Sequence, residues 1–460
     1  MKKLFTFLSL LSFTFQFFSQ YQVGHTTLTF NDPSRTGGYG SGGGTGRQIQ
    51  TEVYYPAASS GDNVAVSSGQ FPVITFGHGF AMSWDAYTNI WQHYAAKGYI
   101  LAFPRTEGGL IPGPSHGDFG SDLKLVADKM LVLNTNSSSI FLGKIKQKVI
   151  LMGHSMGGGA TFLGAASNTN IAGVVGLAPA ETTPSAIAAA PNVSVPALIF
   201  SGSADGVTPP ADNHVPIYQG LTSTCKNFSS ILGGGHCYYA NTNFNCDFGE
   251  STSSPNISIT REAQQTAMYA ILDPWLDFIL NDNCEAYNAF QTAMTNTTGT
   301  QNQSTCPAAQ TVSINANNAV LTASTTGTSY QWFLDGNPIS GATAQNFTAT
   351  QTGNYTVKVT FAYGCTTSAP YTYSTSTTGL EELKNQIYIY PNPTKDVLNL
   401  NNINGLTLRI QLKDMSGRTI LIKEDKATKI SLDIQAITNG NYILVIESPI
   451  GNLTQKLIKE

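Results

Sequence analysis

Charged side chains are scarce in this chain, at 11% of its 460 residues against about 25% in an average soluble domain. The 24 lysines and arginines and the 28 aspartates and glutamates leave a net charge of −4, and nowhere do the basic residues gather into a patch. Proteins that bind nucleic acid usually carry such a patch. The composition therefore argues against nucleic acid as a partner.

Long apolar runs are missing as well, apart from one at the start. Lys2 and Lys3 precede an apolar run over residues 4–18, followed by a serine and a glutamine, which is typical of a secretory signal peptide. The run is too short to span a membrane stably, and nothing later in the chain replaces it. We therefore expect residues 1–20 to be a signal peptide. The mature protein should have no membrane span and should be exported through the periplasm, to be secreted or held at the cell surface.

Cysteine is sparse, but its number is even, which permits three disulfides in an exported protein. We expect two bridges among the first four cysteines and one between the last two. The cysteines stand at Cys225, Cys237, Cys246, Cys284, Cys306 and Cys365.

Short apolar or β-rich runs alternate with segments of helical spacing over the first 294 residues. This alternation predicts a mostly parallel sheet covered by helices on both faces. We expect an α/β domain over residues 21–294 with an eight-stranded sheet. The eight runs are residues 26–30, 50–55, 71–76, 99–103, 149–152, 173–177, 197–201 and 228–232.

The composition changes after Met294. Residues 295–306 are rich in Thr, Asn and Gln without an apolar period, which indicates a linker. Residues 307–375 show short alternating segments and an Asp-Gly-Asn-Pro turn, as in a β-sandwich. A polar spacer leads to a last all-β unit over residues 380–460.

One motif organises the first domain. The apolar run 149–152 is followed by Gly-His-Ser-Met-Gly at residues 153–157, with two more glycines after it. A strand, a serine flanked by glycines and a helix of small residues form a nucleophile elbow, in which strand and helix nearly touch. Ser155 is therefore the candidate nucleophile.

A serine hydroxyl needs a base, and the base needs an acid to hold its tautomer. The strand 197–201 leads to Asp205, our candidate acid, with Asp212 as the substitute. The strand 228–232 leads through three glycines to His236, our candidate base, and we interpret the other histidines as core or loop residues. The chain order Ser, Asp, His is that of the α/β-hydrolases.

The tetrahedral intermediate needs two N–H donors. Met156 supplies one by its position after the nucleophile, and Phe80, after Gly-His-Gly at residues 77–79, is the candidate for the other.

These motifs, in this order, resemble the dienelactone-hydrolase-like branch of the α/β-hydrolases, which includes cutinase-like polyester hydrolases and acetylhydrolases of the platelet-activating-factor type. The resemblance implies an α/β-hydrolase fold without a metal or organic cofactor. In the polyester hydrolases an aromatic residue, a methionine and a tryptophan clamp the substrate. Phe80 and Met156 match the first two, whereas the tryptophan position is Ala180.

The tail carries two further resemblances. Tyr-Gln-Trp-Phe-Leu-Asp-Gly at residues 330–336 and Gly-Asn-Tyr-Thr-Val at 353–357 resemble the immunoglobulin-like domains of secreted Bacteroidetes proteins. Tyr-Ile-Tyr-Pro-Asn-Pro at residues 388–393 and Gly-Asn-Tyr at 440–442 resemble a type IX secretion sorting domain, which implies the type IX machinery as a partner.

We therefore expect a serine carboxylic ester hydrolase that works through an acyl-enzyme. Two classes of substrate fit this expectation: a polyester or cutin-like substrate, and a lipid or acetyl ester. A surface adhesion or glycan-binding protein with an inactive hydrolase domain is the alternative of another class: the immunoglobulin-like module favours it, and the complete set of Ser155, Asp205 and His236 argues against it. We also expect the hydrolase to work when the chain ends after Thr298.

Overall fold

The computed structural model describes residues 21–111, 113–374 and 383–460, so the expected signal peptide lies outside the described residues. The chain divides into two compact units. The first comprises the residues up to Ser313 together with Thr325–Tyr330 and Lys358–Ser368, and the second comprises Ile314–Ser324, Gln331–Val357 and Ala369–Glu460.

The first unit is built on an eleven-stranded sheet in the order β11-β10-β9-β8-β7-β5-β6-β3-β1-β4, with β2 paired to β3. Strands β5 to β10 run parallel, β3 is antiparallel to both β6 and β1, and β11 is antiparallel to β10. The strands are β1 (Gln22–Asp32), β2 (Gly38–Tyr39), β3 (Arg47–Ala57), β4 (Gly61–Asp62), β5 (Phe71–Gly77), β6 (Ile100–Pro104), β7 (Ile145–His154), β8 (Gly173–Leu177), β9 (Ala197–Gly202), β10 (Lys226–Ile231) and β11 (Thr300–Ser304).

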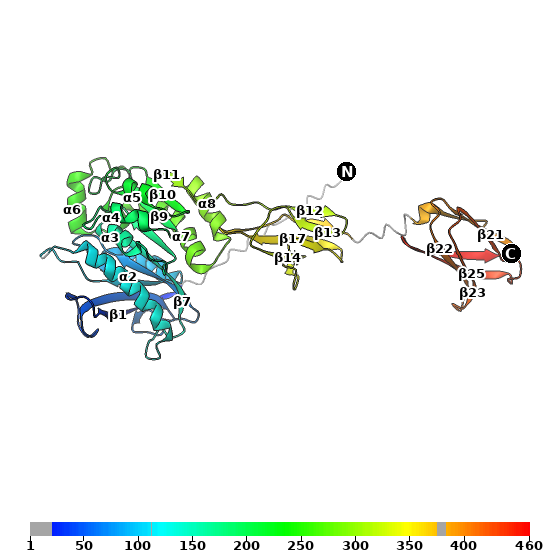
Figure 1. Ribbon diagram of the computed structural model, residues 1–460, viewed down its shortest axis with the longest axis horizontal. Helices are drawn as coiled ribbons and strands as arrows, with labels where there is room; N and C mark the ends of the chain where they lie inside the picture. Colours follow the sequence, from blue (N-terminus) through cyan, green and yellow to red (C-terminus); the bar gives the residue numbers. More distant parts are fainter. Residues whose placement is uncertain (1–20, 112, 375–382) are drawn as a thin grey trace, which may run out of the picture. The chain divides into compact units, whose positions relative to one another are not determined.

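Helices cover both faces of this sheet, because its parallel strands are apolar on both sides (Figure 1). In β7, Val149 and Leu151 join the core under α2 to α5, whereas Ile150 and Met152 join the core under α1, α7 and α8. The helices are α1 (Thr88–Ala96), α2 (His116–Val132), α3 (Met156–Ala165), α4 (Ala186–Ala189), α5 (His214–Gly220), α6 (Phe244–Ser253), α7 (Arg261–Asn281) and α8 (Ala286–Asn296).

The expected mostly parallel α/β fold is confirmed, with a larger sheet than the eight strands expected. The eight predicted runs fall in β1, β3 and β5 to β10. Two of the extra strands, β2 and β4, have two residues each. The third, β11, lies within residues 295–306, which we expected to be a linker. It extends the sheet through backbone pairing with β10.

The disulfides differ from the expected pairing. Cys237 bonds Cys246 as one of the two bridges expected among the first four cysteines, but the other two bridges join Cys225 to Cys306 and Cys284 to Cys365. The reason is β11: its pairing with β10 brings Cys306 beside Cys225, one residue before β10. All three bridges lie in the first unit.

The described part of the tail is all-β. Residues 314–373 form a three-stranded sheet, β12-β13-β16, and a five-stranded sheet in which β19 joins β15-β14-β17-β18, in keeping with an immunoglobulin-like module. Their strands are β12 (Ile314–Asn317), β13 (Val320–Ala323), β14 (Ser329–Leu334), β15 (Asn337–Pro338), β16 (Asn346–Thr348), β17 (Gly353–Thr360), β18 (Cys365–Thr367) and β19 (Tyr371–Tyr373).

The last residues form two more sheets, β20-β21-β24 and β23-β22-β25-β26, which enclose a separate apolar core. Their strands are β20 (Ile387–Tyr390), β21 (Val397–Asn402), β22 (Leu408–Lys413), β23 (Thr419–Asp425), β24 (Lys429–Asp433), β25 (Gly440–Ser448) and β26 (Gly451–Lys459). Among the described residues, no helix is both long and apolar enough to cross a membrane.

Candidate active site

Ser155 lies at the sharp turn between β7 and α3, with 8% of its surface exposed. Its φ is +55° and its ψ is −123°, a conformation that costs free energy for any residue with a side chain. The backbone holds this turn in place: the Ser155 N–H donates to the Leu177 carbonyl at 3.0 Å, and the Ser155 carbonyl accepts from the Ala180 N–H at 2.9 Å. The strain is the geometry expected of a nucleophile elbow.

The glycines around Ser155 are required by close backbone packing. A Cβ on Gly153 would lie 2.3 Å from the Gly157 carbonyl oxygen, and a Cβ on Gly157 would lie 2.3 Å from the Gly77 carbonyl. A Cβ on Gly158 would lie 2.9 Å from the Cα of Pro179. The start of α3 is therefore packed against the ends of β5 and β8 without room for side chains.

Asp205 and His236 lie together, buried, on the loops after β9 and β10. His236 Nδ1 is 2.8 Å from Asp205 Oδ2. The other carboxylate oxygen, Oδ1, accepts from the N–H groups of Val207 and Thr208 at 2.9 and 2.8 Å. Burial alone would raise the pKa of Asp205, but the neighbouring His236 and these donors outweigh it and hold the pKa below its usual range. Asp205 is thus an ionised group aimed at His236.

The structure does not join the third predicted residue to this pair by a hydrogen bond. Among the described residues, the Ser155 hydroxyl has no hydrogen-bond partner. The His236 ring nevertheless lies next to the elbow, since its centroid is 4.8 Å from that of His154, the residue before Ser155. Such hydrogen bonds are often loose in enzymes without substrate.

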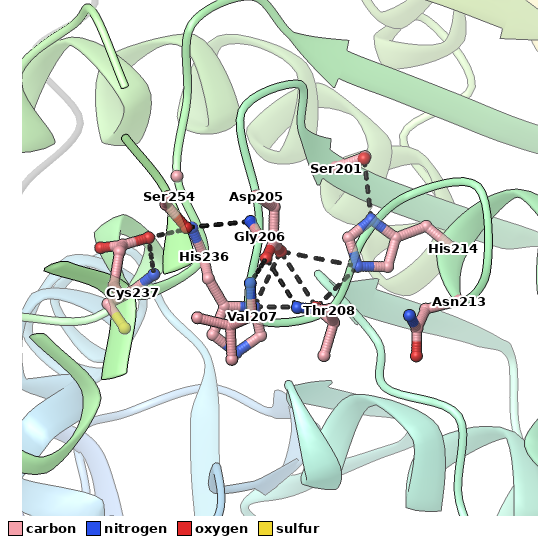
Figure 2. Close-up of polar contacts among 12 residues, drawn as sticks. Ser201, Asp205, Gly206, Val207, Thr208, Asn213, His214, His236, Cys237 and Ser254 are labelled. Atoms are coloured by element: carbon pink, nitrogen blue, oxygen red, sulfur yellow. Dashed lines mark hydrogen bonds and ion pairs between the residues drawn. The ribbon is translucent and has the colours of Figure 1, made fainter. Parts of the chain in front are cut away.

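Two residues that the sequence did not single out complete the surroundings of Asp205 (Figure 2). The Thr208 hydroxyl lies 3.0 Å from Asp205 Oδ2 and 2.9 Å from His236 Nδ1. It also lies 3.0 Å from Nε2 of His214, whose Nδ1 is 2.8 Å from the Ser201 hydroxyl. His214 is fully buried on the first turn of α5, and no strand end points to it in the sequence.

His154 links the elbow to two other loops. Its Nε2 is 3.0 Å from the His236 carbonyl oxygen, and its Nδ1 is 2.9 Å from the Tyr87 hydroxyl, which accepts from the Gly79 N–H at 2.8 Å. Burial, with the nearby His236, lowers the pKa of His154 to about 3. This neutral histidine, which we expected to be a core or loop residue, therefore ties the loop of His236 to the loop before Phe80.

Helix α6 holds the loop of His236 from the other side. The Glu250 carboxylate accepts from the backbone N–H of both His236 and Cys237, the latter at 3.0 Å. Burial raises the pKa of Glu250 despite these donors. The Cys237–Cys246 bridge joins the residue after His236 to the same helix. Nothing in the sequence marked Glu250.

The two candidate oxyanion donors stand at the expected positions. Met156 is the first residue of α3, and Phe80 follows Gly79 in the turn after β5. Neither N–H group has an acceptor among the described residues. The Phe80 side chain is 51% exposed, and a hollow of about 590 Å³ lined by His78, Ala81 and Met82 borders its turn. Ala180 lies beside Ser155 through the backbone bond described above.

The remaining titratable candidates lie elsewhere. Asp212, the substitute acid, is exposed in a turn, and no contact joins it to His236 in the described residues. One group of possible metal ligands gathers in the described part of the chain, formed by Cys237, Asp247 and Glu250. The Cys237 sulfur is held in a disulfide, and Asp247 is paired with Arg261, so this group is a poor metal site.

The chain is similar to known ester hydrolases. Part of the chain is 28% identical over 204 residues to a bis(hydroxyethyl) terephthalate hydrolase of Streptomyces coelicolor, covering 44% of this chain and 57% of that protein. It is 25% identical over 205 residues to a cutinase of Thermobifida alba, covering 44% of this chain and 60% of that protein. The chain thus spans less than two thirds of the length of these relatives.

Two family models match the chain. Residues 388–460 match the secretion system C-terminal sorting domain, of the type IX kind expected from the sequence, which indicates export. Residues 20–254, just over half of the chain, match the family described as PET hydrolase-like. This match stands beside the elbow at Ser155 and the Asp205–His236 pair. The chain belongs to the PET hydrolase-like family.

Proposed function

We propose that this protein is an exported serine carboxylic ester hydrolase with Ser155, His236 and Asp205 as its catalytic triad. The observation that carries the proposal is the buried 2.8 Å contact between His236 Nδ1 and Asp205 Oδ2, set beside the strained turn of Ser155. Strain of this kind persists only where the surroundings enforce it, and it is concentrated at functional sites.

The first half of the reaction forms an acyl-enzyme. Ser155 Oγ attacks the ester carbonyl carbon and passes its proton to His236 Nε2, while the carbonyl electron pair becomes an oxyanion. Asp205 keeps the other ring proton on Nδ1 and stabilises the imidazolium. The intermediate then collapses: the bond to the alcohol breaks, and the alcohol leaves with the proton from His236.

The second half releases the acid. Water takes the place of the alcohol, gives a proton to His236 and attacks the acyl carbon; the proton then returns to Ser155 as the acid departs. In both halves the N–H groups of Phe80 and Met156 are the proposed donors to the oxyanion. The absence of any other acceptor for these groups among the described residues supports this role.

A polyester or cutin-like ester is the proposed substrate class. The names of the two relatives, a bis(hydroxyethyl) terephthalate hydrolase and a cutinase, support it. The exposed Phe80 ring offers an apolar contact at the mouth of the site, with Met156 and Ala180 as the other proposed substrate contacts. Ala180 removes one aromatic wall, so we propose a wider and weaker clamp than a tryptophan would give. The type IX machinery, recruited through the C-terminal domain, is the proposed partner in export.

The test uses the full-length protein and its Ser155→Ala variant on p-nitrophenyl esters of increasing acyl length and on a polyester film. Loss of the nucleophile should lower kcat by about 10⁶-fold. The matched control is Ser121→Ala, an exposed serine on α2, which should keep full activity. Full activity of Ser155→Ala would overturn the mechanism. Hydrolysis confined to acetyl or lipid esters would overturn the polyester assignment and leave the mechanism standing.

A further inference from the structure

Behind Asp205 lies a continuous row of buried polar groups. It runs from the Ser201 hydroxyl through both ring nitrogens of His214 and the Thr208 hydroxyl to Asp205 Oδ2, with successive distances of 2.8, 3.0 and 3.0 Å (Figure 2). Ser201 and His214 are fully buried and Thr208 is 7% exposed. A second histidine therefore reaches the proposed catalytic acid through the Thr208 hydroxyl, and its Nε2 also lies 3.7 Å from Asp205 Oδ2 directly.

The protons in this row can be assigned from chemistry. For His236 Nε2 to act as a base, the ring proton must sit on Nδ1 and face Asp205. The single hydroxyl proton of Thr208 then has two acceptors in reach, Asp205 Oδ2 and His214 Nε2. A hydrogen bond to a carboxylate is about twice as strong as one between neutral groups, so the proton lies on the Asp205 side.

The state of His214 follows. Burial lowers the pKa of His214 to about 3, so the ring is neutral near neutral pH. Since the Thr208 proton faces Asp205, His214 must donate from Nε2 to the Thr208 oxygen and accept the Ser201 proton at Nδ1. All donors in the row then point toward the carboxylate.

We propose that His214 is a positioning residue for the triad: its Nε2–H holds the Thr208 hydroxyl with its proton on Asp205, and so fixes the carboxylate that orients His236. The inference rests on the proposed role of Asp205. An apolar side chain would fill the same space on α5 without a desolvation cost. A buried imidazole at this position therefore indicates that its hydrogen bonds are needed.

The kinetic test compares His214→Leu, His214→Gln and Thr208→Val. Leucine removes the donor, whereas the glutamine amide can still donate to Thr208. Loss of one hydrogen bond to a charged group should lower kcat about 10-fold in Thr208→Val. Without the His214 donor the Thr208 hydroxyl can rotate away from Asp205, so His214→Leu should approach the same loss, whereas His214→Gln should stay within about 3-fold of the unsubstituted protein. The control is His93→Phe, a histidine on α1 away from the site, which should keep its activity.

A pH profile separates positioning from simple damage. The titratable groups that face His236 among the described residues are Asp205, His154, His214 and Glu250. When the Thr208 hydroxyl is removed, or is no longer held on Asp205 by His214, more of the negative charge of the carboxylate faces the His236 ring. The acid limb of kcat/KM should therefore move to higher pH in His214→Leu and Thr208→Val, but not in His214→Gln. A substitution that only loosened the structure around the active site would lower kcat/KM at every pH without moving the midpoint of the acid limb.

A measurement without substrate keeps the inference apart from the proposed function. In the nitrogen-15 NMR spectrum of the full-length protein, the His214 ring should show the Nε2–H tautomer, with the signal assigned by its loss in His214→Gln. An Nδ1–H tautomer, or an acid limb in His214→Leu at the midpoint of the unsubstituted protein, would overturn the inference even in a fully active enzyme. An enzyme that hydrolyses no ester but shows the Nε2–H tautomer would overturn the proposed function alone.

Discussion

At the scale of single residues, Gly157 occupies one of the tightest positions around the nucleophile. A Cβ there would lie 2.3 Å from the Gly77 carbonyl carbon and oxygen and 2.5 Å from the His78 carbonyl oxygen. These are backbone atoms, so no side-chain rotation can relieve the clash. Gly157→Ala should therefore push α3 away from the turn of Phe80 and lower kcat on p-nitrophenyl acetate by about 100-fold through displaced oxyanion donors.

The matched control is Gly249→Ala on α6, where a Cβ meets no atom within 4 Å. That variant should keep its kcat and gain slightly in stability, because alanine favours a helix by up to about 1 kcal/mol over glycine. Equal kcat values for the two variants would show that close packing at Gly157 has no part in the reaction.

The buried histidines predict how stability depends on pH. His154 and His214 have folded-state pKa values of about 3, below the ordinary 6.5, so the unfolded chain binds more protons than the folded one between these values. The contribution of these two histidines to stability is fully present above pH 6.5 and is lost as the pH drops toward 3. At pH 5 the loss is about 2 kcal/mol for each histidine.

Urea unfolding at pH 7.5 and pH 5 checks this. The free energy of unfolding should fall with acidification in the unsubstituted protein, and the fall should be smaller in His214→Gln, which has no proton to gain. His93→Gln serves as the control, since His93 is half-buried and paired with Asp273. An equal fall in His214→Gln and the unsubstituted protein would contradict the expected destabilisation by His214 in acid.

At the scale of elements, α6 holds two loops of the site together. Its Asn245 side chain donates to the Ala81 carbonyl oxygen at 2.8 Å, next to Phe80, while Glu250 and Cys246 hold the loop of His236. Disulfides that close longer loops restrict the unfolded chain more. The two bridges should therefore contribute differently. The long Cys225–Cys306 bridge should contribute mainly to stability, and the short Cys237–Cys246 bridge should mainly hold the loop of His236 in place.

Removing each bridge by a pair of cysteine-to-alanine substitutions tests the difference. Loss of Cys225–Cys306, with a sequence separation of 81, should lower stability by about 4 to 5 kcal/mol and leave kcat nearly unchanged. Loss of Cys237–Cys246, with a separation of 9, should cost about 2 to 3 kcal/mol and also lower kcat, because the loop of His236 is loosened. Thermal unfolding and kcat on a soluble ester measure both effects, and an unchanged kcat in the second pair would refute the role of α6.

The elements that carry the site were predictable from the sequence because each strand ends in chemistry-bearing residues. Buried apolar runs mark β5 and β7 to β9, and Ser155, Asp205 and His236 follow β7, β9 and β10 in that order. Strand β11 could not be predicted this way: its residues, Thr-Gln-Asn-Gln-Ser, are all polar, and it forms by backbone pairing at a sheet edge. The cysteine partners depend on that pairing. Thr208 lies three residues after Asp205, but nothing in the sequence shows that its hydroxyl faces the carboxylate, and the folded chain brings His214 and Glu250 to the site.

At the scale of the whole molecule, we propose that the hydrolase extends beyond residue 294, because β11 pairs with β10. Ending the chain after Thr298, which we expected to keep activity, would remove β11 together with Cys306 and Cys365. That truncation should instead lose two disulfides and expose the edge of β10. A chain ending after Tyr373 keeps every residue assigned to the first unit and should keep kcat on p-nitrophenyl acetate.

Both truncations should be compared by thermal unfolding and kcat after purification under oxidising conditions. Equal stability of the shorter chain and the full-length protein would mean that β11 and its bridge contribute nothing. A collapse of kcat in the chain ending after Tyr373 would place part of the site in the last residues.

Export has its own prediction. Because residues 388–460 match a sorting domain, their deletion in a host with the type IX machinery should leave active enzyme in the periplasm and none outside the cell. Ester hydrolysis in the two fractions measures this, with the full-length protein as control. Normal release of the deleted chain would contradict the sorting role.

The two long disulfides also impose an order in time. A chain is made from its N-terminus, and bridges that join Cys225 to Cys306 and Cys284 to Cys365 cannot close until their second cysteines have been synthesised and translocated. The residues matched to the sorting domain come later still, from 388 onward. All three bridges can therefore close before residues 388–460 have been fully translocated.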